Sequence, residues 1–415
     1  MQKAILAAVC LKKDIEHFAY WIEEFKNLAS ALSIEVVAEC IQQLDKIDPA
    51  SVLGSGKALE LSSLVTLHKT DLVIFFNDLS FSQNKRLSEI CHGATIIDRT
   101  HLIIDIFTQR SNSKEAKIQT EIARLSYNLP IALENEKANS REKGGNFNSR
   151  GSGQSRSEQI KNRYRARIND LKSELKELEK QRSLNADLRN KDHIKKVALV
   201  GYTNAGKSSL MNILLAESNL NNDHKRVFEK DMLFATLDTS TRLIKFNNYK
   251  YYLFDTVGFV SNLPHELIEA FKSTLSVTKE ADLLILVNDA SNPSWEIQKE
   301  ICLNTLKTIG ADHIPIIEVF NKCDLINYEI DNKHLYISAR MHTNIEALNK
   351  LIVNNLYPKE ESILCIVPYL ELGIIDKYKT VLKINHIKYA DEGAVIQVSG
   401  SKEKVQIFEP YRIKV

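Results

Sequence analysis

One run of eight residues has the types and spacing needed to bind a phosphate chain. Gly201-Tyr-Thr-Asn-Ala-Gly-Lys-Ser208 fits the P-loop pattern, in which two glycines separated by four residues are followed by Lys and Ser. The glycines let backbone N–H groups turn inward around phosphate oxygens, and the dipole of a following helix adds to the attraction. We expect Lys207 to reach the β- and γ-phosphates and Ser208 to bind Mg²⁺. The apolar run 197–200 predicts a strand before the loop, and 208–215 predicts a helix after it.

A second run is expected to contact the phosphates and Mg²⁺. Asp255-Thr-Val-Gly258 follows the strand predicted over 251–254. Asp255 can hold Mg²⁺ through water, and Gly258 can present its N–H to the γ-phosphate. Loss of that contact on hydrolysis would release the following segment, as in switch proteins.

Two further runs select the base. Asn321-Lys-Cys-Asp324 follows the strand predicted over 316–319, and its Asp324 carboxylate can accept from N1 and N2 of guanine, for which adenine has no matching donors. Asn321 can bridge loops, and the stem of Lys322 can cover the base. Ser338-Ala-Arg340 fits the remaining loop, with the Ala339 N–H directed at guanine O6. Each short run is weak alone, but the four in this order predict a GTPase.

The position after the Asp-x-x-Gly run lacks the usual catalytic side chain. Many GTPases place Gln there to orient the attacking water, whereas this chain has Phe259. We therefore expect slow intrinsic hydrolysis unless another group helps. Asn204 resembles the K⁺ ligand of P-loops that read G-x-x-N-x-G-K-S in potassium-activated GTPases, so K⁺ is one candidate. The alternative is that Asn204 only shapes the loop.

A second glycine-and-lysine turn, Gly54-Ser-Gly-Lys57, is half a P-loop at most. The pattern would need Gly at position 51, which is Ser51, and Ser or Thr after Lys57, where Ala58 stands. We expect this turn to begin the helix predicted over 57–68.

The remaining pattern predicts an α/β protein of four domains. We expect an N-terminal α/β domain over 1–110, an antiparallel helical hairpin with a glycine-rich basic loop over 111–195, a doubly wound P-loop GTPase domain over 196–357, and a small α+β domain over 358–415. The apolar runs that predict strands are 4–9, 34–38, 71–76, 197–200, 251–254, 283–287, 316–319, 380–387 and 394–398.

The hairpin is predicted from two narrow apolar stripes. One follows steps of 4, 3 and 4 from Ile118 to Leu129, and the other follows steps of 4, 3, 4 and 3 from Tyr164 to Leu178. Two such helices should pack on each other. Residues 134–154, rich in Gly, Ser, Asn and Arg, should form a mobile loop at the tip. A dimeric coiled coil is weaker, because this loop breaks the stripes, and we expect a monomer.

Charge and cysteine content limit which partners the protein can have and in which cell compartment it can reside. Between Arg141 and Lys196, 16 Lys or Arg face 8 Asp or Glu, so this segment carries +8 while the rest of the chain carries −6. A local basic surface is a candidate nucleic-acid face, although a solvated charged face is equally compatible. The six cysteines are scattered without a Cys-x-x-Cys pair, and no apolar run reaches about 18 residues, so we expect a cytoplasmic protein without a membrane span.

These runs together resemble the HflX-type GTPases over nearly the whole chain. The run 231–238, Asp-Met-Leu-Phe-Ala-Thr-Leu-Asp, is similar to the family's switch I, which implies Thr236 as a second Mg²⁺ ligand. Residues 255–259 and 263–271 are similar to its switch II, so Phe259 is a family trait. Ile97-Asp-Arg-Thr100 with 105–110 is similar to the family's signature before the hairpin.

The resemblance implies GTP hydrolysis and binding to the large ribosomal subunit and its RNA, with a role in splitting or rescuing ribosomes under stress. One departure concerns the loop, which in the family ends in Gly-Pro-Gly-Glu and here reads Arg150-Gly-Ser-Gly-Gln154. The loop should be less rigid, and its activity at the ribosome's catalytic centre stays open. The alternative function is an RNA-binding assembly or scaffold protein that uses GTP as a structural ligand with negligible turnover.

The expected site residues fall into three sets. Those expected to act in hydrolysis are Asn204, Lys207, Thr236 and Gly258, and the expected Mg²⁺ ligands are Ser208, Thr236 and, through water, Asp255. Those expected to contact GTP or GDP are Gly201, Tyr202, Thr203, Asn204, Ala205, Gly206, Lys207, Ser208, Phe234, Ala235, Thr236, Leu237, Asp238, Asp255, Thr256, Val257, Gly258, Asn321, Lys322, Cys323, Asp324, Ser338, Ala339 and Arg340.

Overall fold

The fold is known from a computed structural model of the 415-residue chain. The residues that it describes are 2–142, 156–190, 194–218, 240–247, 249–261, 267, 277–326, 333–358, 361–378, 382–400 and 405–413. The chain forms two compact units, Met1–Ile345 and Glu346–Val415. Among the described residues, no helix is both long enough and apolar enough to cross a bilayer.

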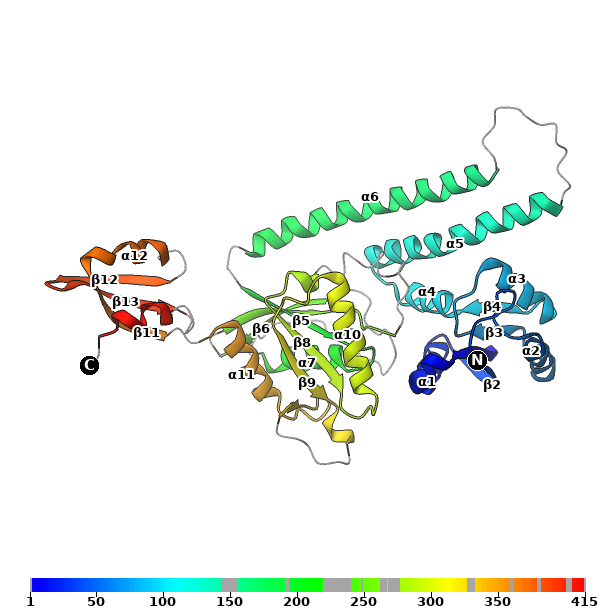
Figure 1. Cartoon of the computed structure of the whole chain (residues 1–415), viewed down its shortest axis with the longest axis horizontal. Helices are drawn as coiled ribbons and strands as arrows, with labels where there is room; N and C mark the ends of the chain where they lie inside the picture. Colours follow the sequence, from blue (N-terminus) through cyan, green and yellow to red (C-terminus); the bar gives the residue numbers. More distant parts are fainter. Residues whose placement is uncertain are drawn as a thin grey trace. The chain divides into compact units, whose positions relative to one another are not determined.

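A four-stranded parallel sheet forms the N-terminal domain (Figure 1). Its strand order is β2-β1-β3-β4, with β1 at Gln2–Leu11, β2 at Ile34–Leu44, β3 at Leu72–Phe75 and β4 at Thr95–Asp98. The helices are α1 (Ile15–Ala31), α2 (Ser55–His68), α3 (Phe81–Ile90) and α4 (Arg99–Arg110).

Strand β1 is buried on both faces. Leu6 and Ala8 pack in one cluster with residues of α1 and α4, whereas Ala7 and Val9 pack in another with residues of α2 and α3. Side chains alternate along a strand, so a strand covered by helices on both sides is a continuous apolar run. This explains the run 4–9 and confirms the predicted first strand.

Two long helices form the predicted hairpin, α5 (Lys114–Glu142) and α6 (Arg156–Asn190), which run side by side in Figure 1. Lys114 pairs with Glu174 at 2.6 Å, and Glu121 pairs with Arg167 at 3.1 Å. The order of these contacts makes the two helices antiparallel. The two predicted stripes share one apolar cluster, which contains Ile118, Ile122, Ile168 and Leu171.

The loop predicted over 134–154 begins later than expected. Helix α5 continues to Glu142, so the prediction was wrong for 134–142. This stretch contains Glu, Lys, Ala and Arg, which favour helix, and the first glycines come only at 144 and 145. Residues 143–154 lie outside the described part of the chain.

A six-stranded sheet follows, with the order β10-β9-β8-β5-β7-β6 (Figure 1). All neighbouring strands are parallel except β6 and β7. The elements are β5 (Lys195–Gly201), α7 (Lys207–Glu217), β6 (Ser240–Phe246), β7 (Tyr249–Asp255), β8 (Leu283–Asp289), α10 (Trp295–Ile309), β9 (Ile316–Asn321) and β10 (Leu335–Tyr336). Strand β6 was not predicted, because this edge strand is mostly half-buried and has no continuous apolar run.

The second unit carries a three-stranded antiparallel sheet of order β11-β13-β12. Its elements are β11 (Glu361–Val367), α12 (Gly373–Tyr378), β12 (Lys383–Ala390) and β13 (Gly393–Gly400), and α11 (Ile345–Leu356) precedes them. Ile363, Cys365, Ile396 and Phe408 contribute to its own apolar core. The predicted α+β class is confirmed, although β12 begins at Lys383 instead of 380 and β11 was not predicted.

Candidate nucleotide-binding site

The phosphate loop connects β5 to α7 in the middle of the six-stranded sheet. Strand β5 has β8 on one side and β7 on the other, so the strand order changes direction at β5. In open α/β sheets, ligands bind at such a point, outside the carboxyl ends of the strands. Gly206 has φ +89°, and a Cβ there would lie 2.2 Å from Nδ2 of Asn321. Glycine alone suits both the left-handed backbone and this close approach, so the loop can turn directly into the N-terminus of α7.

Lys207, the first residue of α7, is folded back over the loop. Its Nζ donates to the carbonyl oxygens of Gly201 at 3.0 Å and Tyr202 at 2.8 Å. The residue is only 6% exposed, and this burial lowers the pKa of Lys207, whereas the nearby Asp255 carboxylate acts in the opposite sense. These two loop carbonyls therefore fix the position of the ammonium group.

Ser208 and Asp255 meet beside Lys207. The Ser208 hydroxyl donates to Oδ2 of Asp255 at 2.7 Å, and Asp255 is the last residue of β7 and fully buried. The next residue, Thr256, is fixed by a 2.6 Å hydrogen bond from its hydroxyl to the Leu199 carbonyl. A hydroxyl and a carboxylate form the oxygen donor set that Mg²⁺ prefers, so these residues fit that ion.

The start of switch II lies directly on the phosphate loop. The Phe259 N–H donates to Gly201 O at 3.1 Å, and the Thr203 N–H donates to Phe259 O at 2.8 Å. A Cβ on Gly258 would come within 2.9 Å of Thr203 Cα and 3.0 Å of Lys207 Nζ. Gly258 therefore approaches the loop as closely as only glycine can.

The side chain of Phe259 is turned away from the phosphate side. It is 2% exposed and packs in an apolar cluster with Tyr202 and Cys302. An aromatic ring in this core cannot orient a water molecule, which gives a structural reason for the absence of Gln at this position.

The two runs predicted to select the base meet at the ends of β9 and β10. Asn321 bridges two loops, because its Nδ2 donates to Ala205 O at 2.9 Å and its Oδ1 accepts from the Ala339 N–H at 3.0 Å. The Ser338 hydroxyl donates to Oδ1 of Asp324 at 2.6 Å, which orients that carboxylate. The predicted role of the Ala339 N–H toward guanine O6 stays a prediction, since this N–H donates to Asn321 here.

Lys322 and its neighbours complete this end of the site. Lys322 pairs with Asp289 at 2.8 Å, which holds its stem beside the loop. Cys323 is half-buried, and burial is the main cause that raises the pKa of its thiol. Arg340 is exposed.

Other predicted residues lie in the loop without turning their side chains to its phosphate side. Tyr202 and Val257 are buried in apolar clusters, and they can contact a nucleotide only through their backbones. Asn204 is exposed and has φ +61°, so it stands at the outer turn of the loop. The switch I residues 234–238, and switch II beyond Ser261 apart from Leu267, lie outside the described residues.

A buried polar cluster lies behind the loop, and no motif or spacing in the sequence predicted it. Glu24 of α1 accepts from the Tyr202 and Ser261 hydroxyls and from Nη2 of Arg99 at 2.9 Å. Tyr20 hydrogen-bonds with Tyr202, and burial, followed by the charge of Glu24, raises the pKa of Tyr20 to about 12. The one available signal was Arg99, which lies in the run Ile97–Thr100.

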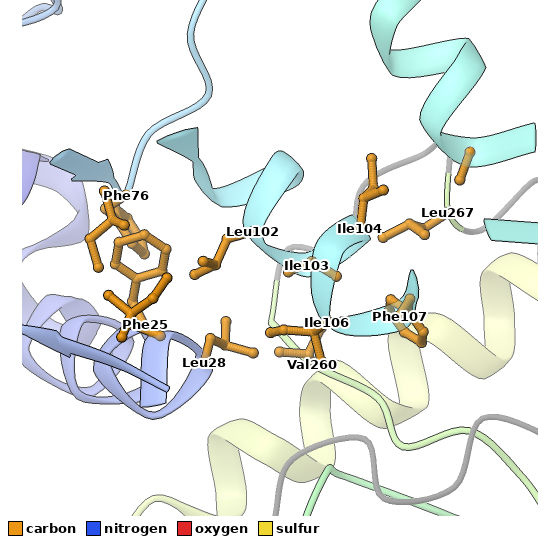
Figure 2. Close-up of a cluster of buried hydrophobic side chains, with 14 of the residues drawn as sticks. Phe25, Leu28, Phe76, Leu102, Ile103, Ile104, Ile106, Phe107, Val260 and Leu267 are labelled. Carbon is orange, nitrogen blue, oxygen red and sulfur yellow. The ribbon is translucent and has the colours of Figure 1, made fainter. Parts of the chain in front are cut away.

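An apolar contact surrounds this polar cluster. Figure 2 shows Val260 beside Ile106 of α4 and Leu28 of α1, and Leu267 near Ile104. Val260 is 1% exposed and Leu267 is fully buried. Residues from the switch II region are therefore packed into the core of the N-terminal domain.

Three family models match the chain in succession. They are described as GTP-binding GTPase N-terminal over residues 20–108, GTP-binding GTPase Middle Region over 110–189, and 50S ribosome-binding GTPase over 196–322. Together they extend from α1 to the end of β9 and Lys322.

Two relatives are similar to this chain over most of its length. GTPase HflX of Caldanaerobacter subterraneus subsp. tengcongensis is 38% identical over 373 residues, which cover 89% of this chain and 84% of that protein. GTPase HflX of Escherichia coli is 34% identical over 354 residues, covering 83% and 80%. A GTP-binding protein from Sulfolobus solfataricus, solved in complex with GDP, is 26% identical with a TM-score of 0.42, covering 86% of this chain and 99% of that one.

Proposed function

The chain belongs to the HflX family of GTPases, and we propose that it couples GTP hydrolysis to binding of the large ribosomal subunit through its helical hairpin. One observation supports GTP binding and hydrolysis: three groups of residues lie along one edge of the six-stranded sheet. They are Lys207, the Ser208–Asp255 pair and the Asn321–Asp324–Ser338 group. In this proposal the protein splits or rescues ribosomes in the cytoplasm under stress, and it acts as a monomer.

The residues act on the nucleotide in distinct ways. Lys207 and the loop N–H groups stabilise negative charge on the β- and γ-phosphates. Ser208, Asp255 through water, and Thr236 would hold Mg²⁺, which supplies further neutralisation of phosphate charge when bound. Asp324, oriented by Ser338, accepts from the guanine edge, and Gly258 presents its N–H to the γ-phosphate.

Phe259 occupies the position at which many GTPases have the Gln that orients the attacking water. Because Phe259 is buried in the core, we propose a slow intrinsic rate that the ribosome stimulates. Asn204 is exposed at the outer turn of the loop, where it is accessible to a K⁺ ion beside the phosphates. Turnover should then be faster in KCl than in NaCl of equal ionic strength, and equal rates would remove K⁺ from the proposal.

The hairpin offers the contact to ribosomal RNA. On α6 five basic side chains follow steps of 4, 7, 4 and 4 residues and so share one face, namely Lys161, Arg165, Lys172, Lys176 and Lys180. We call this set the cationic stripe. It extends for about 28 Å at 1.5 Å per residue, which suits several successive phosphates of an RNA strand. Four of its side chains are exposed and Lys161 is half-buried, with Glu158 at one end of the same face.

The apolar stripes support a monomer. Ile118 and Ile122 of α5 share a buried cluster with Ile168 and Leu171 of α6, so each helix covers the other within one chain. A dimeric coiled coil would have to break this packing.

The experiment is GTP hydrolysis with and without purified large subunits, with Lys207→Ala as the blank. Stimulation that vanishes in the blank is the expected result. The reversal Lys172→Glu/Lys176→Glu should weaken subunit binding by about tenfold or more, since each phosphate contact contributes a salt-dependent share of affinity. Basal turnover should stay within about twofold, because neither residue belongs to the nucleotide site.

A matched control reverses two positive charges elsewhere on α6. Arg156→Glu/Arg163→Glu changes two exposed residues that lie off the cationic stripe. Equal loss of binding in both double variants would show that net charge, and not the stripe, holds the RNA. Light scattering of joined ribosomes with GTP tests splitting separately, and unchanged scattering despite tight subunit binding would favour a scaffold role.

A further inference from the structure

The buried polar cluster joins the N-terminal domain to both the phosphate loop and switch II. Its four members are almost inaccessible, with exposures of 6% for Glu24, 4% for Arg99, 3% for Tyr202 and 1% for Ser261. A buried ion pair loses hydration, so it contributes little net stability over well-packed apolar side chains. The function of this pair is therefore better sought in the geometry that it imposes on its neighbours than in its contribution to stability.

The cluster holds Ser261 by its backbone as well as its side chain. Nη2 of Arg99 donates to Ser261 O at 2.7 Å, to Ser261 Oγ at 3.0 Å and to Glu24. The Ser261 N–H donates to the Tyr202 hydroxyl at 2.7 Å, and that hydroxyl donates to Glu24. Both peptide groups that flank Ser261 are thus fixed by residues from α1, α4 and the phosphate loop.

Each residue between Gly258 and Ser261 has its own fixed contact. Phe259 is paired with Gly201 and Thr203 through its backbone. Val260 is packed under Ile106 and Leu28, as Figure 2 shows. The chain therefore has little freedom to move Gly258 away from Thr203 and Lys207, against which it lies.

We propose that Glu24 and Arg99 are positioning residues for GTP hydrolysis, because they hold Ser261 and through it the N–H of Gly258 that meets the γ-phosphate. Their side chains contact Tyr202 and Ser261, and neither residue belongs to the predicted nucleotide or Mg²⁺ contacts. They act by limiting the positions of the Gly258 N–H. A hydrogen-bond donor stabilises the transition state only when it is correctly placed. This inference rests on the GTPase activity of the family and is independent of the ribosomal partner.

The proposal predicts a split between turnover and GDP binding. GDP has no γ-phosphate, so its affinity should not depend on where Gly258 lies. Glu24→Gln should lower kcat for GTP by about tenfold, the cost of one misplaced transition-state contact, with KM and the Kd for GDP within about twofold. Ser261→Ala, which removes only a hydroxyl, should lower kcat by about threefold.

The two changes should not add. Since both act through one cluster, the double variant should be no slower than Glu24→Gln alone. Lys299→Gln is the control, because it breaks a different and more exposed ion pair of the same unit, with Glu318 at 2.7 Å, outside this cluster. It should leave kcat within about twofold.

Loss of the Glu24 charge leaves Arg99 buried without its carboxylate, so this variant is the one most prone to unfold. Ser261→Ala and Arg99→Lys keep the charge balance, and both are assayed beside thermal unfolding. Arg99→Lys retains the charge but not the forked donor, and its kcat should lie between those of wild type and Glu24→Gln. Unchanged kcat in the folded variants, or a loss of GDP affinity in parallel with kcat, would overturn the proposal.

Discussion

The N-terminal sheet and the six-stranded sheet each have a glycine-and-lysine turn at the start of a helix, and only one turn forms a phosphate loop. In the N-terminal domain, Gly54 precedes α2 with an ordinary φ of −62°, and its N–H donates to Oε1 of Gln42 at 2.8 Å. Lys57 pairs with Glu60 at 2.7 Å at the surface. In the GTPase domain, Gly206 is left-handed and Lys207 is buried against loop carbonyls.

The difference lies in the backbone. Five residues connect β5 to α7, so the strand end and the helix N-terminus share one small loop. Ten residues separate Leu44, the end of β2, from Ser55, the start of α2. The same residue types thus form a cradle of N–H groups only where the strand leads directly into the helix and a left-handed glycine permits the turn.

The largest expected effect concerns the two lysines. Lys207→Ala should lower kcat/KM for GTP by about 100-fold or more, because it removes the buried cation that we propose to face the phosphates. Lys57→Ala should change it by less than about twofold and should alter stability little, since exposed ion pairs contribute about 0–1 kcal/mol. Steady-state kinetics and thermal unfolding of both variants make the comparison. A large kinetic loss in Lys57→Ala would mean that the N-terminal turn also serves the reaction.

The second effect concerns the two glycines. Gly206→Ala should weaken binding of GTP and GDP alike by about tenfold or more, because the left-handed backbone costs about 1–2 kcal/mol and the new Cβ meets Asn321. Gly54→Ala has an ordinary backbone, and its Cβ would lie 3.1 Å from the end of the Gln42 side chain, which can adjust. Titration with a fluorescent GDP measures both variants. Comparable losses would show that the two turns are not so different as their backbones indicate.

The smallest effect concerns a hydroxyl at the base-recognition end. Ser338→Ala removes the hydrogen bond that orients Asp324, and GTP affinity should fall about fivefold, as expected for one hydrogen bond to a charged group. The control is Ser63→Ala on α2, whose hydroxyl donates to the Leu59 carbonyl at 3.0 Å and should not affect nucleotide binding. Competition by ATP is measured in parallel. If Ser338→Ala keeps both its affinity for GTP and its preference for GTP over ATP, then Asp324 holds its position without Ser338.

Local patterns in the sequence predicted the features that local contacts form. The phosphate loop, the strands before it and the hairpin stripes each depend on residues only a few positions apart, and their periodicity or spacing is visible directly. The edge strand β6 was missed because it has no long alternating or apolar run. Strand β11 was missed although it contains the apolar run 363–367. The loop boundary at 134 was wrong because its first nine residues favour helix as strongly as a polar loop.

The polar cluster could not be predicted in this way. Glu24 and Arg99 are 75 residues apart, and Arg99 and Ser261 are 162 apart. No spacing rule links a glutamate in the middle of one helix with an arginine at the start of another and a serine of a distant switch. Only the packing of the two domains brings them together, as it does Val260 and Ile106.

That long separation has a consequence for the order in which the chain can fold. The ribosome that makes this protein releases Glu24 and Arg99 well before Ser261. The strands and helices of the N-terminal sheet can form as they emerge, but the partners that Ser261 and Val260 supply come only after about 160 more residues, roughly 8–30 seconds at ordinary synthesis rates. During that interval a nascent chain presents the Glu24–Arg99 pair without Ser261 and an apolar face of α4 without Val260, a combination that chaperones at the exit tunnel can engage.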